Sequence, residues 1–126
     1  MIRAWRRAHP PLRSVGKPPD VRFTLANERT FLAWTRTAMA LIATGLAIVS
    51  LLPKFELAAG RRLIGVPLIA AGAVVAVMSY VHWDAGERAL RLGEPIPPSR
   101  LTAVLAAGIA LSAVIAAVVA SFGTPK

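Results

Sequence analysis

Cysteine is absent from this chain of 126 residues, and only six residues are acidic. The lack of thiols excludes disulfides, thiol catalysis and thiolate metal sites. The two histidines, His9 and His82, stand far apart in the sequence and form no metal-binding pattern. The chain contains neither a phosphate-binding P-loop nor a nucleophile elbow. We therefore expect no enzymatic activity, no metal site and no cofactor.

Apolar and basic residues make up most of what remains. Hydrophobic residues account for 56% of the chain, and the formal net charge is +9. A soluble domain of this size rarely has such a composition. Basic charge on an apolar chain indicates anionic lipid headgroups or an anionic ligand as partners. Because the apolar segments favour lipid, we do not expect nucleic-acid binding.

Three apolar segments are each long enough to cross a bilayer, which takes roughly 20 residues. They cover residues 31–52, 63–83 and 101–122. The sequence therefore predicts an all-α integral membrane protein, with three transmembrane helices preceded by a short amphipathic helix. We expect a flexible basic tail over residues 1–19 and a membrane domain over residues 20–122. We expect no signal peptide, because the first 30 residues are polar and the following segment is too long.

The distribution of basic residues predicts the orientation in the cell's inner (plasma) membrane. Ten lysines and arginines lie before the first segment or between the second and third, against four at the other ends. Cytoplasmic loops carry the excess of such residues. The N-terminus is therefore expected in the cytoplasm and the C-terminus outside.

Local signals mark the expected helix ends. Asp20 is placed to cap a helix that begins at Val21, and Ser99 is placed to cap the third span. The second helix is expected to continue past Trp83 to about Leu92, with Gly93 ending it.

Two acid-first pairs support that continuation of the second helix. Asp84 precedes Arg88 by four residues, and Glu87 precedes Arg91 by the same spacing. Pairs in this order stabilise the helix that carries them.

Three arginines, Arg22, Arg29 and Arg36, follow one another at intervals of seven residues. Seven residues drift only about 20° from two full helical turns, so these side chains share one helix face. We call this face the arginine stripe, and it is our candidate path for an anion, since basic rings select anions in pores. Two other interpretations remain open: Arg36 snorkels to the headgroups, and Arg22 and Arg29 bind lipid phosphates. Glu28 is either a latch to an arginine of a neighbouring helix or a solvated acid.

The third span carries small residues at steps of four. These are Gly108, Ser112, Ala116 and Ala120. Such a ridge permits close contact between helices in a membrane. Since three helices have little interior of their own, we expect a homo-oligomer.

Two motifs resemble a known family. Residues 25–38, with the sequence LANERTFLAWTRTA, closely resemble the opening of the domain-of-unknown-function 202 family, which includes YidH-like small membrane proteins. A second match is residues 80–83, Tyr-Val-His-Trp. The module is also similar to the three-span membrane domain of the vacuolar transporter chaperone complex. The resemblance extends over about residues 20–122.

The resemblance implies a function. The eukaryotic complex makes polyphosphate and passes it through a membrane channel built from these modules, with basic residues of the first helix facing the path. Arg22, Glu28 and Arg29 occupy the matching positions in this chain. The residue after the His-Trp pair is basic in that pattern, whereas Asp84 reverses the charge here. Arg36 belongs to the bacterial version of the motif.

Two functional hypotheses follow. The first is an oligomeric channel or translocator subunit for an anion such as polyphosphate or phosphate. The second is a non-transporting membrane subunit that docks a partner protein or organises lipid.

Overall fold

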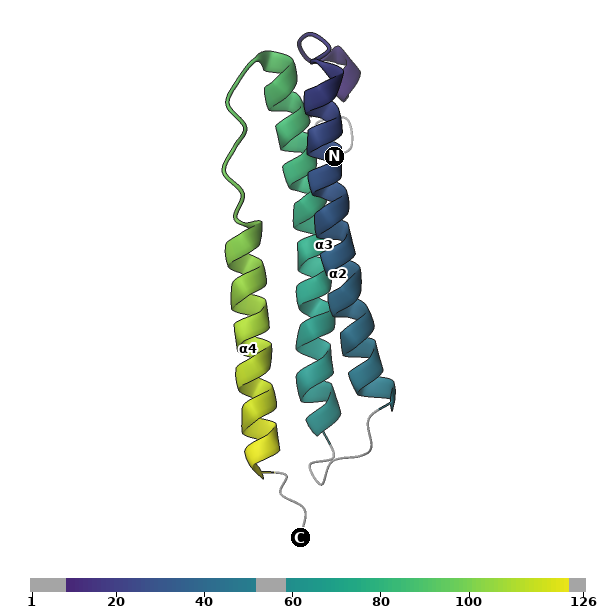
Figure 1. Cartoon of the computed structure of the whole chain (residues 1–126), viewed down its shortest axis with the longest axis vertical. Helices are drawn as coiled ribbons and strands as arrows, with labels where there is room; N and C mark the ends of the chain where they lie inside the picture. Colours follow the sequence, from purple (N-terminus) through teal and green to yellow (C-terminus); the bar gives the residue numbers. More distant parts are fainter. Residues whose placement is uncertain (1–8, 52–58, 123–126) are drawn as a thin grey trace.

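The computed structural model describes residues 9–51 and 59–122. It contains a single-turn 3-10 helix, η1 (Leu12–Ser14), and three long helices, α2 (Val21–Leu51), α3 (Gly60–Leu92) and α4 (Leu101–Phe122). No strand occurs in the described part of the chain. All three long helices are long and apolar enough to span a membrane (Figure 1). The predicted all-α, three-span membrane fold is confirmed.

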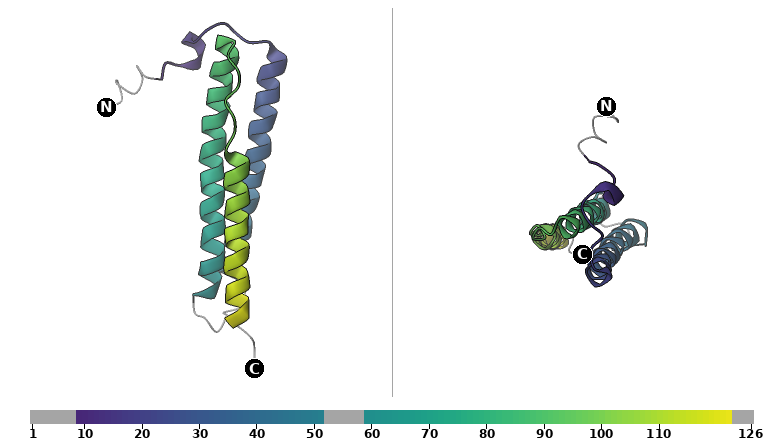
Figure 2. Two further views of the ribbon diagram at one scale, coloured as in Figure 1. Left: turned by 90° about the vertical axis from the view of Figure 1, so that its left-hand side faces the viewer. Right: turned by 90° about the horizontal axis from the view of Figure 1, so that it is seen from above.

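The three helices run side by side, with α3 in the middle. α2 packs along most of α3, and α4 packs on α3 as well (Figures 1 and 2). Seen from above, α4 and α2 lie on different sides of α3 (Figure 2). Much of the surface of α2 is therefore left uncovered within one chain.

Capping residues lie at the predicted starts of α2 and α4 and at the predicted end of α3. The Arg22 backbone N–H donates to Oδ1 of Asp20 at 2.9 Å, and the Leu101 N–H donates to Oγ of Ser99 at 3.2 Å. Gly93 follows α3 in the left-handed conformation, with φ of 69°. These contacts satisfy backbone groups that a helix end leaves without partners.

α2 and α3 are longer than the apolar segments that predicted them. The part expected as a short amphipathic helix is helical, but it continues without a break into the first span. At 1.5 Å per residue, α2 and α3 are about 45–50 Å long and α4 about 33 Å. Since the hydrocarbon layer is about 30 Å thick, α2 and α3 extend well beyond it. Residue 52, the expected end of the first span, lies outside the described residues.

α2 and α3 approach each other through glycines. A Cβ atom built on Gly45 would lie 2.6 Å from the Gly65 carbonyl oxygen, and one on Gly72 would lie 2.8 Å from the Ala38 carbonyl oxygen. Such separations leave no room for a side chain. Close backbone contact replaces the hydrophobic driving force that is missing between helices in lipid.

The small-residue ridge of α4 is used within the chain at two of its positions. A Cβ atom on Gly108 would lie 3.2 Å from Cβ of Ala71 in α3, and Ser112 is buried. Ala120 is exposed. The first half of the ridge therefore contacts α3.

Candidate functional site

The end of the bundle where α2 begins and α3 ends carries the charged candidates, and we call it the charged end. α4 starts well below it (Figure 1), and its first residue, Leu101, is buried beside Ala38 and Val75. The first turns of α2 and the last turns of α3 therefore extend past α4 as a two-helix arm. The predicted charge pairs and two of the three stripe arginines lie on this arm.

An aromatic cluster marks the base of the arm. The Trp83 ring lies 6.1 Å from the Phe31 ring and 6.0 Å from the Tyr80 ring, between centroids. Tryptophan and tyrosine concentrate where a membrane meets water. Taking this cluster as the boundary places Arg36 about 7.5 Å further along α2, within reach of the headgroups.

The arginine stripe lies on the outer surface of α2. Arg22, Arg29 and Arg36 are all exposed, and the Arg22 side chain keeps 90% of its accessible surface. Two residues mark the side of α2 that faces α3. These are Asn27, which is hydrogen-bonded to the backbone of α3, and Ala38, which is buried. At about 100° per residue, the stripe points almost directly away from that side. The helix geometry therefore brings the three arginines together on a face that α3 does not cover.

Glu28 also lies on the exposed surface of α2. Within the described residues it makes no hydrogen bond or ion pair. A latch through Glu28 therefore requires a group from another chain, and it stays a prediction.

A buried polar cluster joins the two helices of the arm. Glu87 is only 4% exposed, and its Oε1 accepts from the Thr24 hydroxyl at 3.4 Å and lies 3.6 Å from Nε of Arg91. One turn lower, the Asn27 amide donates to the Trp83 carbonyl at 3.0 Å, where Gly86 leaves room for it. We call Thr24, Asn27, Glu87 and Arg91 the polar clasp. It fixes the register of α2 against α3 at the charged end.

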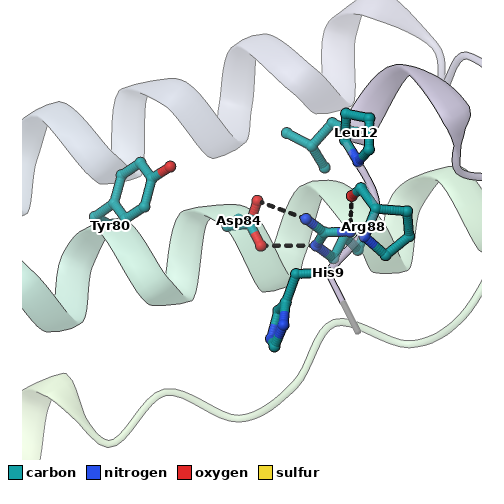
Figure 3. Close-up of a pocket in the computed structure, with 7 residues that line it drawn as sticks. His9, Leu12, Tyr80, Asp84 and Arg88 are labelled. Atoms are coloured by element: carbon teal, nitrogen blue, oxygen red, sulfur yellow. Dashed lines mark hydrogen bonds and ion pairs between the residues drawn. The ribbon is translucent and has the colours of Figure 1, made fainter. Parts of the chain in front are cut away.

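The chain segment before α2 is held against α3. Nε of Arg88 donates to Asp84 at 2.7 Å, and its Nη1 donates to the Pro10 carbonyl at 2.8 Å (Figure 3). The Lys17 N–H donates to the Arg91 carbonyl at 3.1 Å. A cavity of about 420 Å³ between this segment and α3 is lined by His9, Tyr80 and Asp84, among others. The two predicted ion pairs of α3, Asp84 with Arg88 and Glu87 with Arg91, are thus both present.

The spacing of four residues predicted the pairing of Glu87 with Arg91 but not the burial of Glu87. The available signal was a second interval of seven. Gly65, Gly72, Ser79 and Gly86 repeat at that interval, and all four are buried. This repeat defines the side of α3 that meets α2, and Glu87 lies next to it.

Removing the carboxylate of the clasp is expected to destabilise the arm. Glu87→Ala removes the acceptor of the Thr24 hydroxyl and leaves the buried guanidinium of Arg91 without its ion-pair partner, at a cost of about 1–3 kcal/mol. Thermal unfolding in detergent, followed by tryptophan fluorescence, measures the loss. Glu94→Ala is the matched control, because Glu94 is exposed and outside the clasp. Equal melting temperatures for the two variants would contradict this role.

In the described part of the chain, no three His, Asp or Glu side chains lie close enough to share an ion. The cationic groups of the charged end are suited instead to oxyanions, which a guanidinium binds through two parallel hydrogen bonds.

Comparisons with known proteins identify the family. The model of the domain of unknown function DUF202 matches residues 22–89. The uncharacterized protein Rv2272 of Mycobacterium tuberculosis (strain H37Rv) is 41% identical over 98 residues, covering 78% of this chain and 80% of the relative. The inner membrane protein YidH of Escherichia coli (strain K12) is 38% identical over 101 residues, covering 80% and 88%. No solved structure matches the chain. The chain therefore belongs to the DUF202 family, as a small multi-pass membrane protein similar to YidH.

Proposed function

We propose that this protein is a subunit of an oligomeric channel or translocator for an oxyanion of the phosphate class, phosphate or polyphosphate. The observation that carries the proposal is the exposure of Arg22, Arg29 and Arg36 on one uncovered face of α2. A charged side chain near or within a bilayer is costly, and such residues generally face a water-filled space or a partner.

The proposal requires several copies of the chain. Within one copy, α2 and α4 each pack mainly on α3, which lies between them. One copy therefore has no room for an aqueous path between its helices, whereas a ring of copies with α2 inward surrounds one. The uncovered face of α2 is the surface that such a ring would use.

Asp84 does not act as a free negative charge against this function. Both of its carboxylate oxygens contact Arg88, at 2.7 and 3.4 Å. The pair as a whole is neutral. The charge reversal at this position therefore leaves the basic character of the charged end intact.

We place the charged end in the cytoplasm, on the excess of lysine and arginine there. Anionic headgroups on that side of the membrane are expected to contact the exposed arginines of the arm. A reporter fused after Lys126 that reads out cytoplasmic location would contradict this orientation.

The test combines assembly and flux. Native mass spectrometry in mild detergent is expected to give a closed ring of about four to six chains, which makes a central path possible. Proteoliposomes are expected to release trapped radiolabelled phosphate or short polyphosphate faster than protein-free liposomes, and to retain a trapped cation. A monomer that persists across detergents, together with no anion release, would contradict the proposal.

A docking subunit is the second candidate, favoured by the outer face of α4. Leu111, Val114 and Val118 are at least half exposed there. Within a membrane, that face contacts lipid or a partner helix. Reproducible co-purification of one membrane protein, together with no anion flux, would favour this function over a channel.

A further inference from the structure

A row of threonines runs along α2 beside the arginine stripe. Thr30, Thr37 and Thr44 repeat at intervals of seven, as the arginines do. Thr30 and Thr44 are exposed and Thr37 is half-buried. We call these three residues the threonine row.

Alanines fill the strip between the two rows. Ala26, Ala33, Ala40 and Ala47 share the same interval of seven, and all four are exposed. At about 100° per residue, they lie between the arginines and the threonines on the helix surface. The uncovered face of α2 is therefore a shallow trough of small side chains, with guanidinium groups on one side and hydroxyls on the other.

The other side of the arginine stripe is apolar. Leu25, Leu32, Met39 and Leu46 form a ridge there, each about half exposed or more. This ridge suits lipid, whereas the hydroxyls of the threonine row are unfavourable against lipid unless they find a hydrogen-bond partner. The polarity of the α2 surface thus changes from one side of the arginines to the other.

A cavity lies where the threonine row reaches the charged end. It measures about 200 Å³, and its lining includes Ala26, Asn27, Thr30 and His82. The cavity is formed between α2, α3 and the segment before α4. The trough therefore begins in a space that already holds amide, hydroxyl and imidazole groups.

Thr44 carries the row deep into the membrane. It lies about 20 Å beyond Phe31 along the helix, inside a hydrocarbon layer of about 30 Å. The hydroxyls of Thr30 and Thr37 donate to the carbonyls of Ala26 and Ala33, at 3.1 and 3.2 Å. The Thr44 hydroxyl has no hydrogen-bond partner within the described residues. A polar group without a partner is unfavourable against lipid, whereas a water-filled space would satisfy it.

We infer that the threonine row forms one wall of a water-filled path that continues from the arginine stripe across the membrane, and that hydrated oxyanions share this path. The inference rests on the proposed function, and it adds the residues that line the path beyond Arg36. The arginines attract the anion, and the hydroxyls keep the remaining length of the trough wetted.

Cysteine accessibility tests the inference, and the chain itself has no cysteine to remove. Thr44→Cys is compared with Leu46→Cys, which lies at nearly the same depth on the apolar ridge. Both are treated in proteoliposomes with a membrane-impermeant anionic methanethiosulfonate. Thr44→Cys is expected to react at least about tenfold faster, because the thiolate is the reactive form and hydrocarbon disfavours it. Added inorganic polyphosphate is expected to slow this reaction.

Equal rates at the two positions would overturn the inference, as would a fast reaction at Thr44→Cys that polyphosphate does not slow. Thr37→Cys and Met39→Cys form a second pair, should either first variant fail to fold. Labelling after denaturation confirms that each thiol is present. Because labelling needs no transport, the outcome is independent of flux: arginine-dependent flux with an unreactive Thr44→Cys would leave the channel standing and remove only this path.

Discussion

Replacing Arg29 and Arg36 together by glutamine is expected to lower phosphate or polyphosphate flux in proteoliposomes by about 100-fold. A guanidinium about 4 Å from an anion contributes up to about 4 kcal/mol at an effective dielectric constant of 20. Losing only about 1.4 kcal/mol of that at each position lowers a rate tenfold. The two effects multiply because the arginines act on the same anion in sequence.

Arg62→Gln is the matched control for the double variant. Arg62 is exposed at the first turn of α3, at the opposite end of the bundle from the arginine stripe. The loss of one arginine charge there, half of that in the double variant, is expected to leave flux within about twofold, since exposed charges beyond about 10 Å are largely screened. Unchanged flux in the double variant would remove the arginine stripe from the path.

A leucine in place of Gly72 is expected to disrupt the packing of α2 on α3, with loss of the folded protein from detergent extracts. The Cβ atom alone would lie 2.6 Å from Cγ1 of Ile42 and 2.8 Å from the Ala38 carbonyl oxygen. A backbone atom cannot move aside as a side chain can. Overpacking of this kind costs about 1–3 kcal/mol or more, and fluorescence-detected size-exclusion chromatography measures the loss of the folded species.

Alanine substitutions separate the clash from the change in helix propensity. Gly72→Ala and Gly108→Ala each gain about 1 kcal/mol of intrinsic helix propensity. At Gly108 the nearest atom is Cβ of Ala71 at 3.2 Å, so the gain is expected to offset the contact. At Gly72 the clash is expected to dominate. A higher melting temperature for Gly72→Ala than for Gly108→Ala would contradict the importance of the glycine contact.

Helix number and helix ends were predictable because their causes are local. The cap by Asp20, the left-handed Gly93 and the cap by Ser99 each depend on residues within one turn. The extension of α3 to Leu92 depends on spacings of four residues. Contacts between residues so close in the sequence can be predicted from the order of the residues alone.

The environment of Glu87 was not predictable in the same way. Its spacing from Arg91 is equally consistent with a surface pair. Burial required α2 to lie against that side of α3, which the glycine contacts of Gly45 with Gly65 make possible. Gly45 and Gly65 lie on different helices and are far apart in the sequence. No rule about neighbouring residues therefore connects this contact to the burial of Glu87.

The sequence by itself determined that this protein crosses a membrane three times, that its basic residues gather at one end, and that three arginines share one helix face. Periodicity and hydropathy suffice for these statements, since a helix fixes which residues share a side. Only the tertiary structure decided that α3 occupies the opposite side of α2, leaving Arg22, Arg29 and Arg36 exposed. The physical reason is that small residues on α2 and α3 allow the closest backbone approach, and this contact selects which face of α2 stays open.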